Sequence, residues 1–189
     1  KHQNARTCHS VIQHFHYTQV TSTNDTAKDL IQAQEGLPFV LTADHQTKGR
    51  GTRHKHWYSD PGKQLLYTLC MKHKEKKIDS EKIILLTAKK IKQVIQTQCQ
   101  VELQVQWPND LLLNNKKCAG ILVENRQSKF ESTLIIGIGL NMTNTEFPEA
   151  LRHAATSILL ETGRKIQPAS LVMPLSEALI KGLESIEKD

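Results

Sequence analysis

The stretch QWPNDLLLNNKKCAGILVE, residues 106–124, carries the most structural and chemical information in this chain. Two apolar segments flank the polar residues 114–117, a pattern that predicts a β-hairpin. Paired strands bring residues to within about 5 Å of each other, so we expect Lys117 near the turn that carries Asn109 and Asp110. A lysine at the end of a buried strand pair is unfavourable unless its ammonium meets an anion. The stretch therefore predicts a site for a polyanion and a metal ion.

Hydrophobic patterns on either side of this stretch predict the remaining strands and helices. Strands are expected at residues 11–18, 39–43, 64–71, 101–106, 111–113, 119–124 and 133–139. Helices are expected from Ser22 or Thr23 to Gly36, from Asp79 or Ser80 through Ile95, from Thr156 to Gly163 and from Leu171 to Ile186. Strands outnumber helices and tight turns join several of them, which indicates an α+β fold with a mixed, largely antiparallel sheet. No GxGxxG motif opens a βαβ unit, which disfavours a dinucleotide-binding fold.

Composition and charge limit the class of protein. The 189 residues are 38% apolar and 23% charged, which is typical of one soluble globular domain. No apolar run of about 18 residues predicts a membrane span, and no signal peptide is visible at the start. The net charge of +6 suits an anionic partner, which can be a nucleotide, a nucleic acid or an acidic protein.

Cysteine and histidine spacing predicts no zinc site. The four cysteines are Cys8, Cys70, Cys99 and Cys118. They form no CxxC pair, so we interpret them as reduced thiols of a cytoplasmic protein. His14 and His16 alternate on a predicted strand, and we interpret them as solvated side chains rather than metal ligands.

A second unusual stretch, TADHQTKGRGTRHKHW at residues 42–57, follows a predicted strand. Its Gly49 and Gly51 let the backbone approach a ligand closely, and Arg50 can hold carboxylate or phosphate oxygens through two parallel hydrogen bonds. Trp57 closes the stretch and can belong to the core or stack on a nucleobase. Taken alone, the stretch also fits a solvated surface loop or a nucleic-acid-binding patch.

Two shorter motifs complete the set of candidates. The run Ser22-Thr23-Asn24 stands at the start of the first predicted helix, where a hydroxyl can cap the helix and free amides attract carboxylates and phosphates. The run GIGLN ends the last predicted strand, so Asn141 can present a carboxamide where Gly137 and Gly139 permit close approach. A capped strand end and a plain Pro-Asn-Asp turn remain the structural alternatives.

In order and spacing, these motifs resemble the biotin protein ligase family over roughly residues 15–165. The matching residues are Ser22-Thr23-Asn24, Gln46-Thr47, Gly49-Arg50-Gly51, Trp57, Trp107-Pro108-Asn109-Asp110-Leu111, Lys117, Gly120-Ile121-Leu122, Glu124, Gly137-Ile138-Gly139, Asn141, Ala155-Thr156-Ser157-Ile158 and Gly163. The resemblance implies a fold like the catalytic core of class II aminoacyl-tRNA synthetases, in which helices back a mixed sheet. It also implies two reactions: biotin and MgATP give biotinyl-5′-adenylate and pyrophosphate, and the biotinyl group then passes to a lysine of a biotin carboxyl carrier protein, such as that of acetyl-CoA carboxylase.

The resemblance also implies roles for individual residues. The biotin-binding residues would be Ser22, Thr23, Asn24, Gln46, Gly49, Arg50, Gly51, Thr52, Lys117 and Gly120. The ATP-binding residues would be Arg50, Trp57, Asn109, Lys117 and Asn141. The catalytic residues would be Lys117, which bridges the biotin carboxylate and the α-phosphate, Arg50, and Asp110, which steers the carrier lysine. Mg²⁺ would arrive with ATP near Asn109, with no metal site built by the protein itself.

Two positions depart from the family pattern. The fourth position of the glycine-rich loop, usually a second arginine, is Thr52, and the lysine that often precedes the Trp-Pro-Asn-Asp turn is Gln106. Thr52 carries no charge, so we expect weaker retention of the adenylate unless Arg53 reaches into the site. We expect the activity itself to survive both changes.

Residues 1–189 are interpreted as a single catalytic domain, with neither an N-terminal DNA-binding domain nor a C-terminal β-barrel domain. The expected protein is cytoplasmic, a monomer or homodimer, without DNA or membrane partners. Three alternatives stay open. One is a lipoate- or octanoate-protein ligase of the same superfamily, which would lack this pairing of motifs. The others are a basic nucleic-acid-binding module, disfavoured by the scarcity of aromatic residues, and a non-catalytic biotin- or carrier-binding protein.

Overall fold

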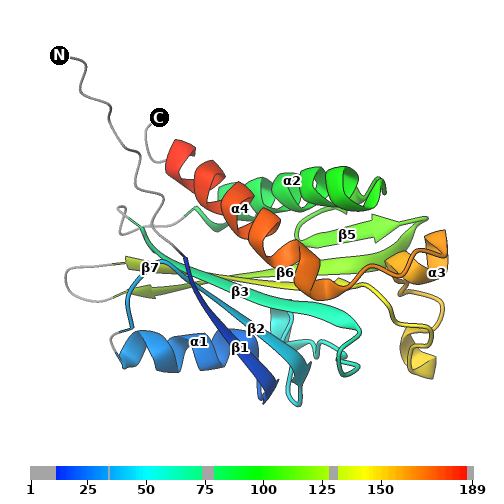
Figure 1. Ribbon diagram of the computed structural model, residues 1–189, viewed down its shortest axis with the longest axis horizontal. Coiled ribbons are helices and arrows are strands. Elements are labelled where there is room, and N and C mark those ends of the chain that lie inside the picture. The colour runs from blue at the N-terminus through cyan, green and yellow to red at the C-terminus, as the bar shows by residue number, and fades with distance from the viewer. Residues whose placement is uncertain (1–11, 34, 74–78, 128–131, 187–189) are drawn as a thin grey trace.

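Seven strands form one sheet in the part of the chain that this computed structural model describes, residues 12–33, 35–73, 79–127 and 132–186 (Figure 1). The strands are β1 (Gln13–Val20), β2 (Phe39–Gln46), β3 (Gln64–His73), β4 (Gln104–Gln106), β5 (Asp110–Leu113), β6 (Lys116–Gln127) and β7 (Ser132–Asn141). They are arranged in the order β1-β2-β3-β7-β6-β5-β4. Within this sheet β1 and β2 are parallel and the other neighbours are antiparallel, so the predicted α+β fold is confirmed.

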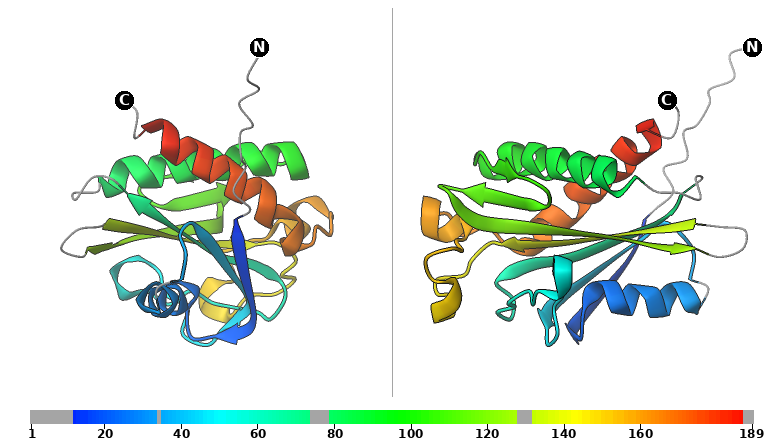
Figure 2. Two further views of the ribbon diagram at one scale, coloured as in Figure 1. Left: turned by 60° about the vertical axis from the view of Figure 1, so that its left-hand side comes forward. Right: turned by 180° about the vertical axis from the view of Figure 1, so that it is seen from behind.

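Helices cover the two faces of the sheet unequally. The helices are α1 (Thr23–Gln32), α2 (Ser80–Cys99), α3 (Ile158–Thr162) and α4 (Val172–Ile186), with short 3-10 turns η1 (Thr52–His54), η2 (Glu149–Leu151) and η3 (Pro168–Leu171). The pair α2 and α4 lies on one face, and α1 lies on the other (Figures 1 and 2). None of the helices in the described ranges combines the length and the hydropathy that crossing a lipid bilayer requires.

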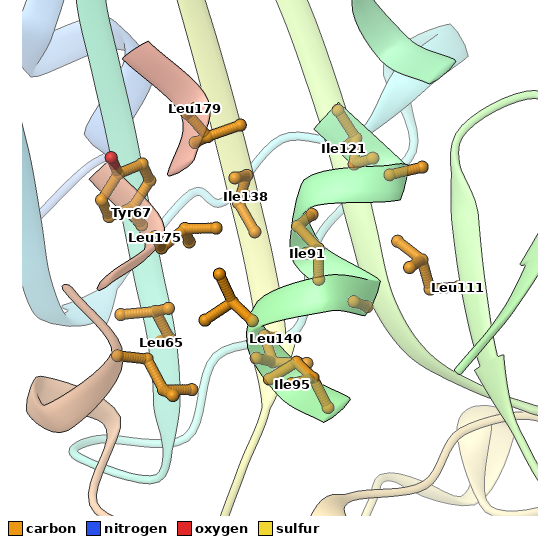
Figure 3. Packing of buried hydrophobic residues seen from close by; sticks show 14 of the residues in the cluster. Leu65, Tyr67, Ile91, Ile95, Leu111, Ile121, Ile138, Leu140, Leu175 and Leu179 are labelled. Atoms are coloured by element: carbon orange, nitrogen blue, oxygen red, sulfur yellow. The ribbon is translucent and has the colours of Figure 1, made fainter. Parts of the chain in front are cut away.

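The larger part of the core fills the space between the sheet and the α2–α4 layer. Tyr67, Ile138 and Leu179 are among the buried side chains that meet there (Figure 3). A smaller cluster under α1 consists of Ala27, Phe39, Leu41, Cys70 and Ile135. Each fully buried large apolar side chain contributes about 1.5–3 kcal/mol, so the α2–α4 side supplies most of the stability.

Side-chain alternation along β7 leaves an open area on the face that carries α1. Successive residues of a strand point to opposite faces, and here Ile136 and Ile138 enter the larger core while Ile135 packs under α1. Gly137 and Gly139 continue the α1 face beyond Ile135. Because neither glycine has a side chain, other groups can lie directly on the sheet at this place.

Several predicted element ends are confirmed. The carboxylate of Asp79 accepts hydrogen bonds from the amides of Glu81 and Lys82, both at 3.1 Å, so α2 begins where predicted. Gly163 ends α3 with φ of 70°, a backbone conformation that suits glycine. Asn114 and Asn115 form the predicted hairpin turn between β5 and β6, with φ of 49° and 63°.

Other predicted ends are wrong by a few residues. The N-cap of α3 is Ser157 rather than Thr156, because the Ser157 hydroxyl accepts from the Leu160 amide at 3.1 Å. Ser22 does occupy the N-cap of α1, but its hydroxyl makes no capping hydrogen bond. The helix ends at Gln32 with Ala33 as its C-cap, rather than at Gly36, whose φ is not positive.

The strands also differ in length from the prediction. β2 continues to Gln46, so part of the predicted loop is strand. The strand expected at residues 101–106 is confined to Gln104–Gln106, an exposed edge strand, while Val101 and Leu103 are buried ahead of it. Alternation of apolar residues therefore extended beyond the hydrogen-bonded segment.

The described cysteines are buried thiols, and His14 and His16 lie beside a threonine hydroxyl. Cys70, Cys99 and Cys118 are free and buried, and burial raises the pKa of each thiol; Cys8 lies outside the described residues. On β1, His14 Nε2 and His16 Nδ1 lie 2.8 and 3.0 Å from the Thr42 hydroxyl. Across the described ranges, no three His, Cys, Asp or Glu side chains are grouped so as to hold a metal ion.

Candidate active site

A pocket of about 260 Å³ opens on the face of the sheet that carries α1. Its walls come from the start of α1, the end of β2, the loop after β2, the turn before β5, and β6 and β7. Among the site residues expected from the sequence, it is lined by Ser22, Thr23, Asn24, Gln46, Arg50, Gly51, Thr52, Trp57, Asn109, Asp110, Lys117 and Gly120. The basic loop and the Trp-Pro-Asn-Asp hairpin, about 60 residues apart in sequence, therefore meet at one pocket.

Gly49 and Asn141 lie beside this pocket rather than on its wall. A side chain at Gly49 would stand 2.6 Å from the carbonyl oxygen of Trp57, so the loop needs glycine there in order to fold back on itself. Asn141 lines a smaller adjoining cavity of about 80 Å³. The rings of Tyr58 and Phe147 also line that cavity, with centroids 6.4 Å apart.

Trp57 lies on a floor made by two glycines. Gly120 and Gly139 face each other across β6 and β7. A side chain at Gly139 would come within 2.4 Å of the Trp57 indole, and one at Gly120 within 2.9 Å. Trp57 lines both the pocket and the smaller cavity. Its Nε1 is buried and has no hydrogen-bond partner within the described chain.

Lys117 and Asp110 form an ion pair on the pocket wall, as the hairpin predicts. The distance from Lys117 Nζ to Asp110 Oδ1 is 2.7 Å, and both side chains are about one-third exposed. The ammonium also lies 5.5 Å from the centroid of the Trp57 ring, within the range of a cation–π interaction. The backbone of Lys117 donates to the carbonyl of Ala154 at 2.8 Å and accepts from the amide of Thr156 at 2.9 Å. These bonds hold the strand end and the loop before α3 together.

The start of α1 is fixed by contacts with other strands. The backbone amide and the hydroxyl of Thr23 donate to Gln46 Oε1, at 2.7 and 3.0 Å. Asn24 donates to Glu124 at 2.8 Å and accepts from the Thr68 hydroxyl at 2.7 Å. The carboxamide of Asn24 is thus held by the protein itself, whereas Thr23 and Gln46 form a polar end of the pocket.

Arg50 is directed at carboxylates of α1 and β6. Its Nε and Nη2 donate to the two oxygens of Asp25 at 3.0 and 2.6 Å, and Nη2 also donates to Glu124 at 3.0 and 3.2 Å. Burial lowers the pKa of Arg50, but the charges of Glu124 and Asp25 and their hydrogen bonds outweigh this effect and raise it.

The carboxamides expected near the phosphates also contact the protein. Asn109 Nδ2 donates to the carbonyl of Ile121 at 3.2 Å. Asn141 Nδ2 donates to the carbonyl of Thr156 at 2.9 Å, and its Oδ1 accepts from Gln64 at 2.8 Å. These hydrogen bonds fix both carboxamides, one just before β5 and the other at the end of β7.

Several residues that shape the site had no role predicted from the sequence. Asp25 and Glu124 hold Arg50, and Thr68 and Gln64 hold two of the asparagines. Glu124 stood within a matching motif, and Asp25 directly follows Ser22-Thr23-Asn24, so adjacency was an available signal. Nothing in the local sequence around Thr68 indicated its contact, because the two partners are 44 residues apart.

Known proteins resemble this chain in sequence and in fold. Residues 16–141 match the model of the biotin/lipoate A/B protein ligase family. The chain belongs to this family. The Bifunctional ligase/repressor BirA of Bacillus subtilis is 32% identical over 164 residues, which cover 85% of this chain and 50% of that protein. The Biotin--[acetyl-CoA-carboxylase] ligase of Paracoccus denitrificans is 30% identical over 166 residues, which cover 85% of this chain and 68% of that protein.

Solved structures of family members share the fold. The biotin protein ligase from Aquifex aeolicus in complex with biotin and ATP superposes with a TM-score of 0.81 at 25% identity, covering 94% of this chain and 72% of that one. The expected fold of helices backing a mixed sheet, as in class II aminoacyl-tRNA synthetases, is therefore confirmed. The chain spans about half the length of the first curated relatives that it matches. The relative from Paracoccus denitrificans and the structure from Aquifex aeolicus are named for biotin, so the lipoate or octanoate alternative is not favoured.

Proposed function

We propose that this protein joins biotin to a lysine of a biotin carboxyl carrier domain, through biotinyl-5′-adenylate made from biotin and ATP. The observation that carries the proposal is the Lys117–Asp110 pair, 2.7 Å apart, on the wall of a pocket shared with the Gly49–Gly51 loop. A relative named for acetyl-CoA carboxylase, at 30% identity, supports the choice of carrier.

The two spaces that Trp57 lines suit the two halves of a biotinyl-adenylate. The larger pocket has a polar end at Thr23 and Gln46, which can hydrogen-bond the ureido group of biotin. The smaller cavity between Tyr58 and Phe147 offers aromatic surfaces to adenine. Biotin would then lie with its carboxylate toward Trp57 and Lys117, where the spaces meet.

Lys117 supplies the positive charge that adenylation requires. An oxygen of the biotin carboxylate attacks the α-phosphorus of ATP, the bond to the bridging oxygen breaks, and pyrophosphate leaves. Negative charge on the attacking carboxylate and on the α-phosphate must be neutralised as they approach. The ammonium of Lys117, already at the junction beside Trp57, is placed to contact both groups.

The residues of this site suit an Mg²⁺ ion that is bound to ATP rather than held by the protein. The groups expected near it, Asn109 and Asn141, are neutral carboxamides that already donate hydrogen bonds to backbone carbonyls. The carboxylate of Asp110 is paired with Lys117. Bound to the triphosphate, the ion would neutralise phosphate charge and favour departure of pyrophosphate. Asn109 would be the nearest protein group to it.

Asp110 serves the second reaction. The neutral amine of the carrier lysine attacks the acyl carbon of the adenylate, an amide forms, and AMP leaves with the electrons of the broken acyl–oxygen bond. The amine must lose protons as it reacts, and a carboxylate at the pocket mouth can steer the incoming ammonium and accept a proton. Asp110 becomes available for this once Lys117 contacts the adenylate phosphate.

The test is label transfer in vitro. The chain is incubated with ATP, Mg²⁺ and labelled biotin or lipoate, with and without a biotin carboxyl carrier domain. We expect label on the carrier lysine with biotin, and pyrophosphate release without the carrier. Label with lipoate alone would move the assignment to the other branch of the family. DNA binding that weakens with salt, with no label transfer, would favour the nucleic-acid-binding alternative.

A further inference from the structure

A cluster of charged side chains lies beside the pocket, between α1, β6 and the basic loop. The carboxylate of Glu124 is its centre, and it accepts from Lys28 Nζ at 2.8 Å, from Asn24 Nδ2 at 2.8 Å and from Arg50 Nη2 at 3.0 and 3.2 Å. Asp25 completes the cluster through its two hydrogen bonds from Arg50. Two cations thus face two carboxylates, and their formal charges cancel.

Glu124 is the most rigidly placed member of this cluster. Its side chain is 22% exposed, compared with 42% for Asp25 and 38% for Arg50. Its backbone belongs to β6 and is registered against Ile135 of β7, in the middle of the sheet. A carboxylate fixed on a strand of the sheet can hold in place the loop that carries Arg50.

The same hydrogen bonds commit Arg50 to the protein. Its Nε and Nη2 donate to Asp25 and Glu124, and such charge-assisted bonds are among the strong ones in proteins. To reach a phosphate, the guanidinium would have to exchange two carboxylates for one new anion. Lys117 already stands at the junction of the two spaces, beside the Trp57 ring.

From this geometry we infer that Glu124 is a positioning residue for the proposed reaction, on which the inference rests for its substrate. Through Arg50 it anchors the Gly49–Gly51 loop over the pocket, and through Asn24 it fixes the start of α1 at the biotin end. Arg50 is therefore the anchor of the loop, and Lys117 is the cation that meets the reacting atoms. Loss of the anchor weakens the hold on biotin without removing the charge that adenylation needs.

The first test compares Glu124→Gln with a matched control, Glu177→Gln, which alters an exposed glutamate of α4 on the opposite face of the sheet. Biotin-dependent pyrophosphate release is measured over a range of biotin concentrations at saturating ATP. We expect Glu124→Gln to raise the KM for biotin by roughly ten-fold or more, because a charge-assisted hydrogen bond is lost. The kcat should change by less than about three-fold, and Glu177→Gln should leave both values unchanged. A large fall in kcat with an unchanged KM, or no change in either value, would overturn the inference.

The second test asks whether Glu124 acts through Arg50. The variant Arg50→Gln alters a loop side chain that is 38% exposed, and it should reproduce the KM increase even if Glu124→Gln folds poorly. The double variant should be no worse than the more impaired single variant, because both remove the same contact. Additive losses would show that the two residues act separately and would contradict the anchor.

A third measurement needs no substrate. Deuterium exchange of the backbone amides of residues 48–53 should be faster in Glu124→Gln than in the wild type, and unchanged in Glu177→Gln. Equal exchange in all three proteins would contradict the inference that Glu124 anchors the loop. If the wild type itself releases no pyrophosphate with biotin, the proposed function fails, and this exchange measurement still decides whether Glu124 holds the loop.

Discussion

At the scale of single residues, an ion pair of opposite charges is central to the proposed site. Lys117 and Asp110 lie 2.7 Å apart at the end of a hairpin, and each is assigned a different step of the proposed reaction. In the unliganded chain each neutralises the other. In the proposed reaction, binding of an anionic adenylate would give Lys117 a new partner and leave the Asp110 carboxylate for the incoming amine, which would link the two steps in order.

Replacing Lys117 by alanine should abolish adenylate formation. We expect biotin-dependent pyrophosphate release to fall at least about a hundred-fold, because one preorganised charge at the reacting phosphate is lost. The protein should stay folded, since the Lys117 side chain is 37% exposed. The control is Lys116→Ala, which removes the neighbouring lysine, 3.9 Å from Glu161, and should keep near wild-type release. Normal release from Lys117→Ala would remove its assigned role.

The charge on Glu124 should make stability depend on pH. Burial raises the pKa of this carboxyl, but hydrogen bonds from Lys28 and Asn24 and the charges of Lys28 and Arg50 outweigh it and hold the pKa below the ordinary value of 4.5. A carboxyl with a lowered pKa in the folded state stabilises the fold above the pKa of the unfolded chain. That contribution is lost as the pH falls through the folded-state pKa.

Glu124→Gln should therefore lower the free energy of unfolding by about 1–2 kcal/mol at neutral pH, where the charged hydrogen bonds are intact. The difference from the wild type should shrink as the pH falls through the lowered folded-state pKa of Glu124, because the carboxyl then becomes uncharged like the glutamine side chain. Urea unfolding at a series of pH values measures both quantities. A difference that stays constant across this range would contradict the assignment of the charged network to Glu124.

At the scale of elements, the site depends on two neighbouring strands that each have a glycine at the same paired position. Gly120 of β6 and Gly139 of β7 are partners in the ladder, and the Trp57 indole lies on them. The basic loop can cross the sheet at this level because both positions are glycine. The same indole lines both the pocket and the smaller cavity, so the placement of this loop affects the shape of the site.

Gly139→Ala should displace Trp57. An added Cβ would stand 2.4 Å from the indole, so the ring or the strand must shift. We expect a loss of about 1–3 kcal/mol in the free energy of unfolding and at least about a ten-fold fall in kcat/KM for biotin. The matched control is Gly36→Ala, where an added Cβ has no neighbour within 4 Å and φ is not positive. Equal behaviour of the two variants would mean that Trp57 does not need the glycine floor.

At the scale of the whole molecule, stability and chemistry lie on opposite faces of the sheet. The larger core lies under α2 and α4, while the pocket opens on the face that carries α1. The strands of the sheet serve both sides, because their residues alternate between core and site. Changes in the α2–α4 layer should therefore alter stability with little effect on substrate binding.

Leu179→Ala tests this separation. Leu179 is fully buried in α4, and its truncation should lower the free energy of unfolding by about 2–5 kcal/mol. The KM for biotin should stay within about two-fold at temperatures where the variant is folded. Chemical denaturation and steady-state kinetics measure the two effects. A large change in KM from this variant would show that the two faces are coupled.

The sequence predicted the type of most elements well and their ends less well. Apolar periodicity identified the strands because one face of each is buried, but it overextended the strand at residues 101–106, where Val101 and Leu103 are buried without joining the ladder. Capping differs from helix to helix, because Asp79 accepts two amide hydrogen bonds at the start of α2 and the Ser22 hydroxyl accepts none at the start of α1. Ser157 and Thr156 are chemically alike, so only the backbone direction decided which of them caps α3.

The sequence by itself determined the chemical groups of the site and the local turns that carry them, since the hairpin at Asn114 and Asn115 and the spacing to Lys117 are short-range features. Only the tertiary structure decided which of these side chains contact each other. Arg50 meets Glu124 across 74 positions of sequence, and Trp57 meets Gly139 across the sheet. Such contacts depend on strand order and register, which are set by burial of the whole core, so no local pattern encodes them.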